Sequence, residues 1–266
     1  MQTHTRLWFV GLRCGIADCG IPDDLGSSFS ANTPSNSLDK TMPSDRNHQL
    51  DADEDEVKYR NAVARLPEIS KWATSIVHGV EVPRPNLRKR LASASLCLAL
   101  DLHDSMSALA VIGSRSAIHV LARSVVENYA RGFWIACVAS QNEIERFVAP
   151  KNKGNVQPLT MSLKPLLKSI HASKRGEQSR LGIDTSNSAS LDSFAHGDLG
   201  LMILRNISGY EVGAASTTVL TYQMLIIGVT IAISCVETYV REILDDEQRS
   251  LEVFKAGGIL VSKTFV

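Results

Sequence analysis

The chain has no charged side chain between Glu211 and Glu237, and within this stretch residues 225–236 are almost wholly aliphatic. The stretch is long enough to span a bilayer, which takes about 20 apolar residues. Its first half, however, contains three threonines, a tyrosine and a glutamine, so the strongly apolar part has the length of a buried core helix. We therefore predict a central helix over residues 214–244 of a soluble protein, with a membrane-attached protein as the weaker alternative.

Hydrophobic spacing predicts further helices before this one. Two of them, over residues 86–112 and 115–140, are separated by Gly113 and Ser114, which are typical of a helix stop and the next helix cap. An earlier helical pattern runs through residues 57–76 and contains Pro67, which predicts a kink or a break. Strand-like alternation of useful length is absent from the sequence. The predicted fold class is therefore all-α, an antiparallel bundle of about four to five helices.

Composition divides the chain into three parts. Residues 1–54 are rich in Ser, Asn, Asp and Pro and lack spaced apolar positions, which predicts a disordered N-terminal arm. Residues 55–246 are expected to form the helical bundle domain, and residues 247–266 a C-terminal tail. Because Met42 stands shortly before the first helical pattern, translation starting at Met42 is an alternative to Met1.

The charge balance and the cysteines limit the classes of function. The chain has 28 basic and 28 acidic residues, so the protein has no long-range field that would favour a non-specific nucleic-acid coat, although a small basic site remains compatible. Its five cysteines are an odd number spread along the chain, which is not a disulfide framework. We expect a cytoplasmic protein with no cofactor or metal.

The helix predicted over residues 115–140 is apolar on most of its surface but has a polar stripe. His119, Arg123, Glu127 and Arg131 lie in this stripe. Arg123 and Glu127 are four residues apart, with Arg before Glu, which is the less favourable order for helix stability. A structural ion pair is one interpretation. The other is a polar site in which Arg123 binds phosphate or carboxylate and Glu127 acts as a base or orients the arginine. His196, before Gly197 at a predicted helix break, is the third candidate catalytic residue, and we expect the three to line one polar cleft.

Two sequence motifs support a resemblance. Residues 121–134 read Leu-Ala-Arg-Ser-Val-Val-Glu-Asn-Tyr-Ala-Arg-Gly-Phe-Trp, and residues 193–197 read Ser-Phe-Ala-His-Gly. Together they resemble a poorly characterised group of bacterial helical proteins with an Arg-x-x-x-Glu helix and a later His-Gly. More remotely, the chain is similar to HEPN helical domains, many of which are ribonucleases. Those carry Arg, four to six residues and then His on one helix, whereas Arg115 and His119 are separated by only three.

Two classes of function remain open from the sequence. The first is a helical protein or enzyme that binds an RNA, a nucleotide or another phosphate-containing ligand at Arg123, Glu127 and His196. The second is a non-catalytic module that forms homo-oligomers or binds another protein through buried polar residues.

Overall fold

A computed structural model describes residues 45–149, 162–174 and 211–265, with side chains described from Glu54 and from Thr218 in the helices that begin the first and last of these ranges. The chain divides into two units, residues 1–46 and 47–266. Except for Asp45 and Arg46, which belong to the first unit, all the helices described belong to the second unit. The predicted arm therefore lies largely outside the described residues.

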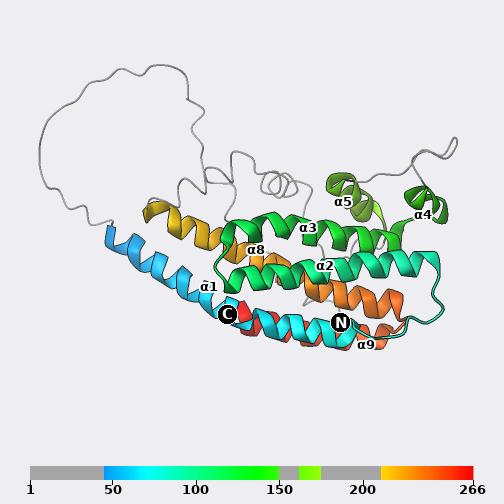
Figure 1. Ribbon diagram of the computed structural model, residues 1–266, viewed down its shortest axis with the longest axis horizontal. Helices are drawn as coiled ribbons and strands as arrows, with labels where there is room; N and C mark the ends of the chain where they lie inside the picture. The colour runs from blue at the N-terminus through cyan, green and yellow to red at the C-terminus, as the bar shows by residue number, and fades with distance from the viewer. Residues whose placement is uncertain (1–44, 150–161, 175–210, 266) are drawn as a thin grey trace, which may run out of the picture. The chain divides into compact units, whose positions relative to one another are not determined.

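The described residues are helical, which confirms the predicted all-α class. Seven α-helices and two π-helices lie in the described ranges, two α-helices more than the predicted upper number. The five long helices form the bundle: α1 (Asp45–Val77), α2 (Leu87–Val111), α3 (Arg115–Phe133), α8 (Glu211–Thr238) and α9 (Glu247–Phe265) (Figure 1). The shorter elements are α4 (Gln141–Val148), α5 (Leu163–Ala172) and the π-helices η2 (Trp134–Val138) and η4 (Tyr239–Ile243), which extend α3 and α8.

Local signals explain several helix boundaries. The side chain of Asn86 accepts a hydrogen bond from the backbone N–H of Lys89 at 2.8 Å and caps the start of α2. Gly113, with φ of +76°, follows the end of α2 in the left-handed conformation that glycine adopts at low cost. Pro67 lies inside α1, which nevertheless runs as one helix to Val77 rather than as two.

Two side-chain contacts define the direction of α8 against α3. Arg115 and His119 of α3 contact Thr218 and Thr221 of α8, respectively, so both helices run the same way. Helix α2 is antiparallel to α3, and α9 is antiparallel to α8 (Figure 1). The bundle is therefore antiparallel between α2 and α3 and between α8 and α9, but parallel between α3 and α8. The long segment between those two helices permits a crossover connection.

Residues 247–265 differ from the predicted tail. They form α9, whose Gly257 packs so closely on α8 that an added Cβ would lie 2.5 Å from Cγ2 of Ile233. Tyr222 of α8 also donates a hydrogen bond to the carbonyl oxygen of Phe265 at 3.1 Å. Two glycines in the middle of the segment lower its helix propensity, and the contact with α8 compensates.

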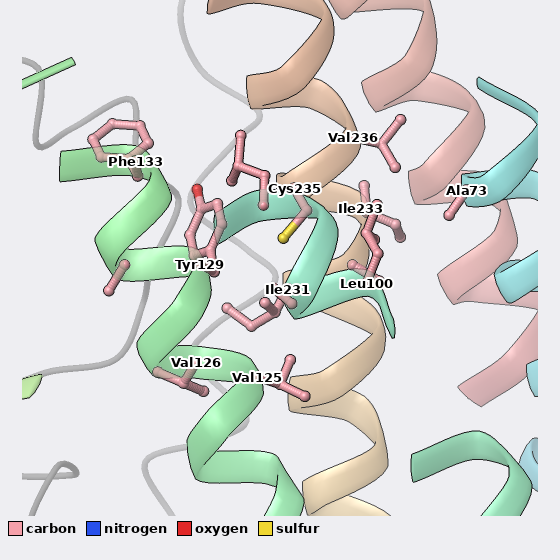
Figure 2. Packing of buried hydrophobic residues seen from close by; sticks show 14 of the residues in the cluster. Ala73, Leu100, Val125, Val126, Tyr129, Phe133, Ile231, Ile233, Cys235 and Val236 are labelled. Carbon is pink, nitrogen blue, oxygen red and sulfur yellow. The ribbon is translucent and has the colours of Figure 1, made fainter. Parts of the chain in front are cut away.

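The core is built around α2, α3 and α8, with buried residues of α1 added to it. Figure 2 shows Tyr129 and Phe133 of α3 on one side, Cys235 of α8 beside Tyr129, Val236 on the side of α8 that faces away from α3, and Leu100 of α2 beside α8. The phenol ring of Tyr129 is buried, and burial raises the pKa of its hydroxyl. The most apolar helix, α8, thus packs against buried side chains of both α2 and α3.

Judged by length and composition alone, two helices among the described residues could cross a membrane, Leu87–Val111 and Thr218–Ile243. The core helices of soluble proteins meet the same criterion, so this is weak evidence. In the second helix 61% of the most apolar window is buried inside the protein, against 39% in the first. Most of the apolar window within Thr218–Ile243 is therefore part of the protein core.

Candidate functional site

The polar stripe of α3 holds a cluster of four side chains, Arg123, Glu127, Asn128 and Arg131, which we call the α3 charge cluster. Glu127 is placed between the two arginines: its carboxylate lies 2.6 Å from a terminal nitrogen of Arg131 and 3.6 Å from Nε of Arg123. Arg131 also donates to the side-chain oxygen of Asn128 at 3.1 Å. The three charged side chains are between 14% and 26% exposed, so solvent screens them only partly.

The order of charges along α3 explains which contact is shorter. Glu127 precedes Arg131 by four residues, which is the favourable order, whereas Arg123 precedes Glu127 in the less favourable one. The sequence predicted only Arg123 as the partner of Glu127, although Arg131 lies in the same stripe. In the structure Arg131 is the closer partner. The favourable order of Glu127 before Arg131 along the helix could have predicted this contact from the sequence.

His196, the third predicted site residue, lies outside the described residues. The structure therefore brings together Arg123 and Glu127 within one helix, while their approach to His196 stays a prediction.

A second group of polar side chains, which sequence reasoning missed, joins three helices. Arg115 of α3 donates to the carboxylate of Glu56 on α1 at 2.7 Å and to the hydroxyl of Thr218 on α8 at 2.7 Å. Its guanidinium also lies 4.9 Å from the ring centroid of Tyr59 on α1, within cation–π range. We call Glu56, Tyr59, Arg115 and Thr218 the three-helix clamp. Burial raises the pKa of the Glu56 carboxyl, but hydrogen bonds from Arg115 and Arg60 outweigh burial, and the pKa is lowered.

His119 lies one turn after Arg115 and is almost completely buried. Its Nε2 is 3.0 Å from the hydroxyl oxygen of Thr221 on α8. Burial lowers the pKa of His119 to about 4, so the imidazole is neutral near pH 7. Arg115 and His119 are the pair compared above with the HEPN pattern, and both make contacts between helices.

A third group lies where the two π-helices approach each other. Arg241 of η4 donates to Glu237 and to Glu242, each at 2.9 Å. Burial lowers the pKa of Arg241, but its two carboxylate partners outweigh burial, and the pKa is raised. In the same region Arg88 of α2 donates to the carbonyl oxygen of Ile135 in η2 at 2.7 Å. Glu237 and Arg241 follow the uncharged stretch directly, and together they anchor the end of α8.

A family model described as a family of unknown function (DUF6988) matches residues 96–244. The chain belongs to this family. The matched region runs from the middle of α2 to the end of η4, so it includes the α3 charge cluster together with Arg115, Thr218 and Arg241. Helices α1 and α9 lie outside the match. Glu56 and Tyr59, the two α1 members of the three-helix clamp, therefore lie outside it as well. No curated protein and no solved structure matches the chain.

The three groups differ in what they can do chemically. The three-helix clamp connects α1, α3 and α8 within the protein, and Arg241 is held by two carboxylates of α8 and its extension η4. The α3 charge cluster instead places two guanidinium groups on one half-buried carboxylate within a single helix. Guanidinium groups bind phosphates and carboxylates by paired hydrogen bonds, so this cluster is the better candidate for an anion site.

Proposed function

We propose that this helical protein binds a small phosphate-bearing ligand at the α3 charge cluster. The observation that carries the proposal is the position of Glu127, whose carboxylate is shared by Arg123 and Arg131. Two guanidinium groups held by one carboxylate keep a defined orientation, which lowers the entropic cost of binding an anion. Both arginines remain partly exposed, so a ligand can reach them.

The proposal is for binding rather than for a defined reaction. A catalytic role for Arg123 and Glu127 would need a group that exchanges protons near neutral pH, and His196 is the predicted group. The resemblance to HEPN domains makes nucleotides and RNA the phosphate ligands to test first. Cleavage of RNA through Arg115 and His119 is not proposed, because both side chains connect helices and His119 is buried and neutral.

Titration calorimetry of the full-length protein with adenosine monophosphate tests the proposal. We expect Arg131→Gln and Arg123→Gln each to raise the Kd about tenfold or more, since a hydrogen bond to a charged group contributes about 1.5–3 kcal/mol. Arg65→Gln, at an exposed arginine of α1, is the matched control and should leave the Kd unchanged. The proposal is lost if the nucleotide does not bind, or if the α3 variants bind it like the wild type.

A second candidate function, self-association, is favoured by one different observation. Three large apolar side chains in or next to α2 are exposed. In α2, Leu98 is 46% exposed and Val111 is 60% exposed, and Ile112, which follows the helix, is 75% exposed. Leu98 and Ile112 lie on similar sides of α2, and a two-fold dimer would bury the same face of both copies. Light scattering coupled to size exclusion should show a dimer that Leu98→Glu with Ile112→Glu converts to monomer.

A further inference from the structure

Although the chain has no net charge, one segment of it contains basic residues and no acidic ones. Between Glu145 and Glu177 the sequence has seven Lys or Arg residues and no Asp or Glu. In a chain with equal numbers of acidic and basic residues, this run is a local concentration of positive charge. Helix α5 lies inside it.

Helix α5 divides its two faces sharply. Its apolar side chains are buried, with exposed fractions of 0% or 1%: Leu163, Leu166, Leu167 and Ile170. On the other face Lys164, Lys168 and His171 are exposed at helical spacing, and exposed Lys174 follows the end of the helix. The hydrogen bond from Nε1 of Trp134 to Ser169 at 3.2 Å fixes α5 against the end of α3. The basic face is therefore held toward solvent by the packing of the opposite face.

The lysines of this face have no acidic partner among the described residues. Elsewhere in the described structure Lys58 is paired with Glu54 at 2.8 Å and Lys89 with Asp245 at 2.7 Å. Among the residues that the structure describes, no carboxylate pairs in this way with Lys164, Lys168 or Lys174, and all three are exposed to solvent.

We propose that the basic face of α5, formed by Lys164, Lys168, His171 and Lys174, binds the phosphate backbone of a nucleic-acid strand. Several charges in succession along one face complement a ligand whose charges also repeat. Neutralising successive phosphates releases counterions, which supplies affinity without any apolar contact. The inference rests on the proposed function in taking the ligand to bear phosphate, but it uses a different surface.

The faces of α5 favour a nucleic-acid strand over two other anionic partners. A helix that lies on a membrane inserts an apolar face among the lipids, and the apolar face of α5 is already buried in the protein. Protein interfaces usually depend on a few large buried anchors such as Trp, Tyr or Arg, and the exposed face of α5 offers none. Binding to a phosphate backbone requires neither feature.

Fluorescence anisotropy of a labelled single-stranded RNA of mixed sequence, titrated with the full-length protein at several salt concentrations, tests the inference. We expect the triple variant Lys164→Gln, Lys168→Gln, Lys174→Gln to weaken binding about tenfold or more at low salt. The slope of log K against log salt should fall by about 2, because each contact to a single strand contributes about 0.7. The control triple variant Lys71→Gln, Lys255→Gln, Lys263→Gln removes the same charge from exposed sites on α1 and α9 and should leave both quantities unchanged.

Each other outcome overturns the inference. These are failure of the wild type to bind RNA, an equal loss in both triple variants, and binding to phosphatidylserine vesicles that depends on the α5 lysines while RNA binding does not. The Arg131→Gln variant separates the two proposals. If Arg131→Gln loses nucleotide binding but the α5 triple variant binds RNA like the wild type, only the proposal for the basic face is refuted. If Arg131→Gln binds the nucleotide like the wild type but the α5 triple variant binds RNA more weakly, only the proposal for the α3 charge cluster is refuted.

Discussion

Glu56 and Arg115 are 59 positions apart in the sequence, yet a carboxylate oxygen of one lies 2.7 Å from a guanidinium nitrogen of the other. Both side chains are less than one third exposed, and Thr218 of α8 bonds to each of them. This pair attaches α1, which lies outside the matched family region, to α3 and α8, which lie within it. The attachment is polar, so its strength depends on pH and on salt.

Replacing Glu56 should therefore destabilise the protein. We expect Glu56→Ala to lower the free energy of unfolding by about 1–2 kcal/mol, because Arg115 loses its carboxylate partner while remaining partly buried. Glu54→Ala is the control, since Glu54 is 67% exposed and pairs with Lys58, which is itself half exposed. Urea denaturation measures both variants, and equal small effects would contradict the role of the three-helix clamp.

Burial of His119 should make stability fall with acidity. The pKa of His119 is about 4 in the folded protein against 6.5 for an unperturbed histidine, so the unfolded chain binds a proton first. The stabilisation is present above pH 6.5 and is lost as pH falls from 6.5 to 4, by at most about 3 kcal/mol. His119→Gln should flatten urea midpoints across this window, whereas His171→Gln, at an exposed position of α5, should not. A wild-type curve that is already flat there would count against burial of the imidazole.

Two adjacent glycines of α9 should respond in opposite ways to the same substitution. A Cβ at Gly257 would lie 2.5 Å from Cγ2 of Ile233, whereas a Cβ at Gly258 would meet no atom within 4 Å. We expect Gly257→Ala to destabilise by about 1–3 kcal/mol through overpacking and Gly258→Ala to stabilise by about 0.5–1 kcal/mol through helix propensity. Thermal unfolding of the two variants measures the difference, and two stabilising substitutions would show that α9 does not pack on α8.

The uncharged helix should be a core element in solution. Val229 of α8 is fully buried, so Val229→Asp should abolish folding, because an unpaired buried charge costs as much as the net stability of a domain. Ile259→Asp is the control, since Ile259 on α9 is 57% exposed. We expect both the wild type and the Ile259→Asp variant in the soluble fraction of a detergent-free lysate. Wild-type protein recovered only with membranes would favour the membrane-attached alternative.

Glu127 should couple more strongly to Arg131 than to Arg123. Its contact with Arg131 is 2.6 Å against 3.6 Å with Arg123, and the order of charges along the helix favours the former. Double-mutant cycles in urea should give about 0.5–1 kcal/mol for Glu127 with Arg131 and a smaller value with Arg123. Equal coupling energies would mean that the order of the charges along α3 does not determine which arginine binds Glu127 more strongly.

The sequence by itself determined helices α2, α3 and α8 and the apolar nature of α8. Periodic apolar positions and the Gly113 stop predicted α2 and α3 well, because these signals act within a few residues. The uncharged stretch predicted α8 as the most apolar element, since a helix that is apolar on every side has to be surrounded by protein or lipid. The polar stripe of α3, including Arg123, Glu127 and Arg131, also followed from helical spacing alone.

Only the tertiary structure decided which distant residues meet. Nothing in the local pattern pairs Glu56 with Arg115 or His119 with Thr221, because such contacts depend on which helices are neighbours and in what direction they run. The sequence predicted an antiparallel bundle, yet α3 and α8 run parallel, because a long connection permits either direction. Residues 247–266 were predicted as a tail. Two adjacent glycines weaken the local helical signal of α9, and its close contact with Ile233 on α8 supplies the stabilisation that the sequence pattern does not show.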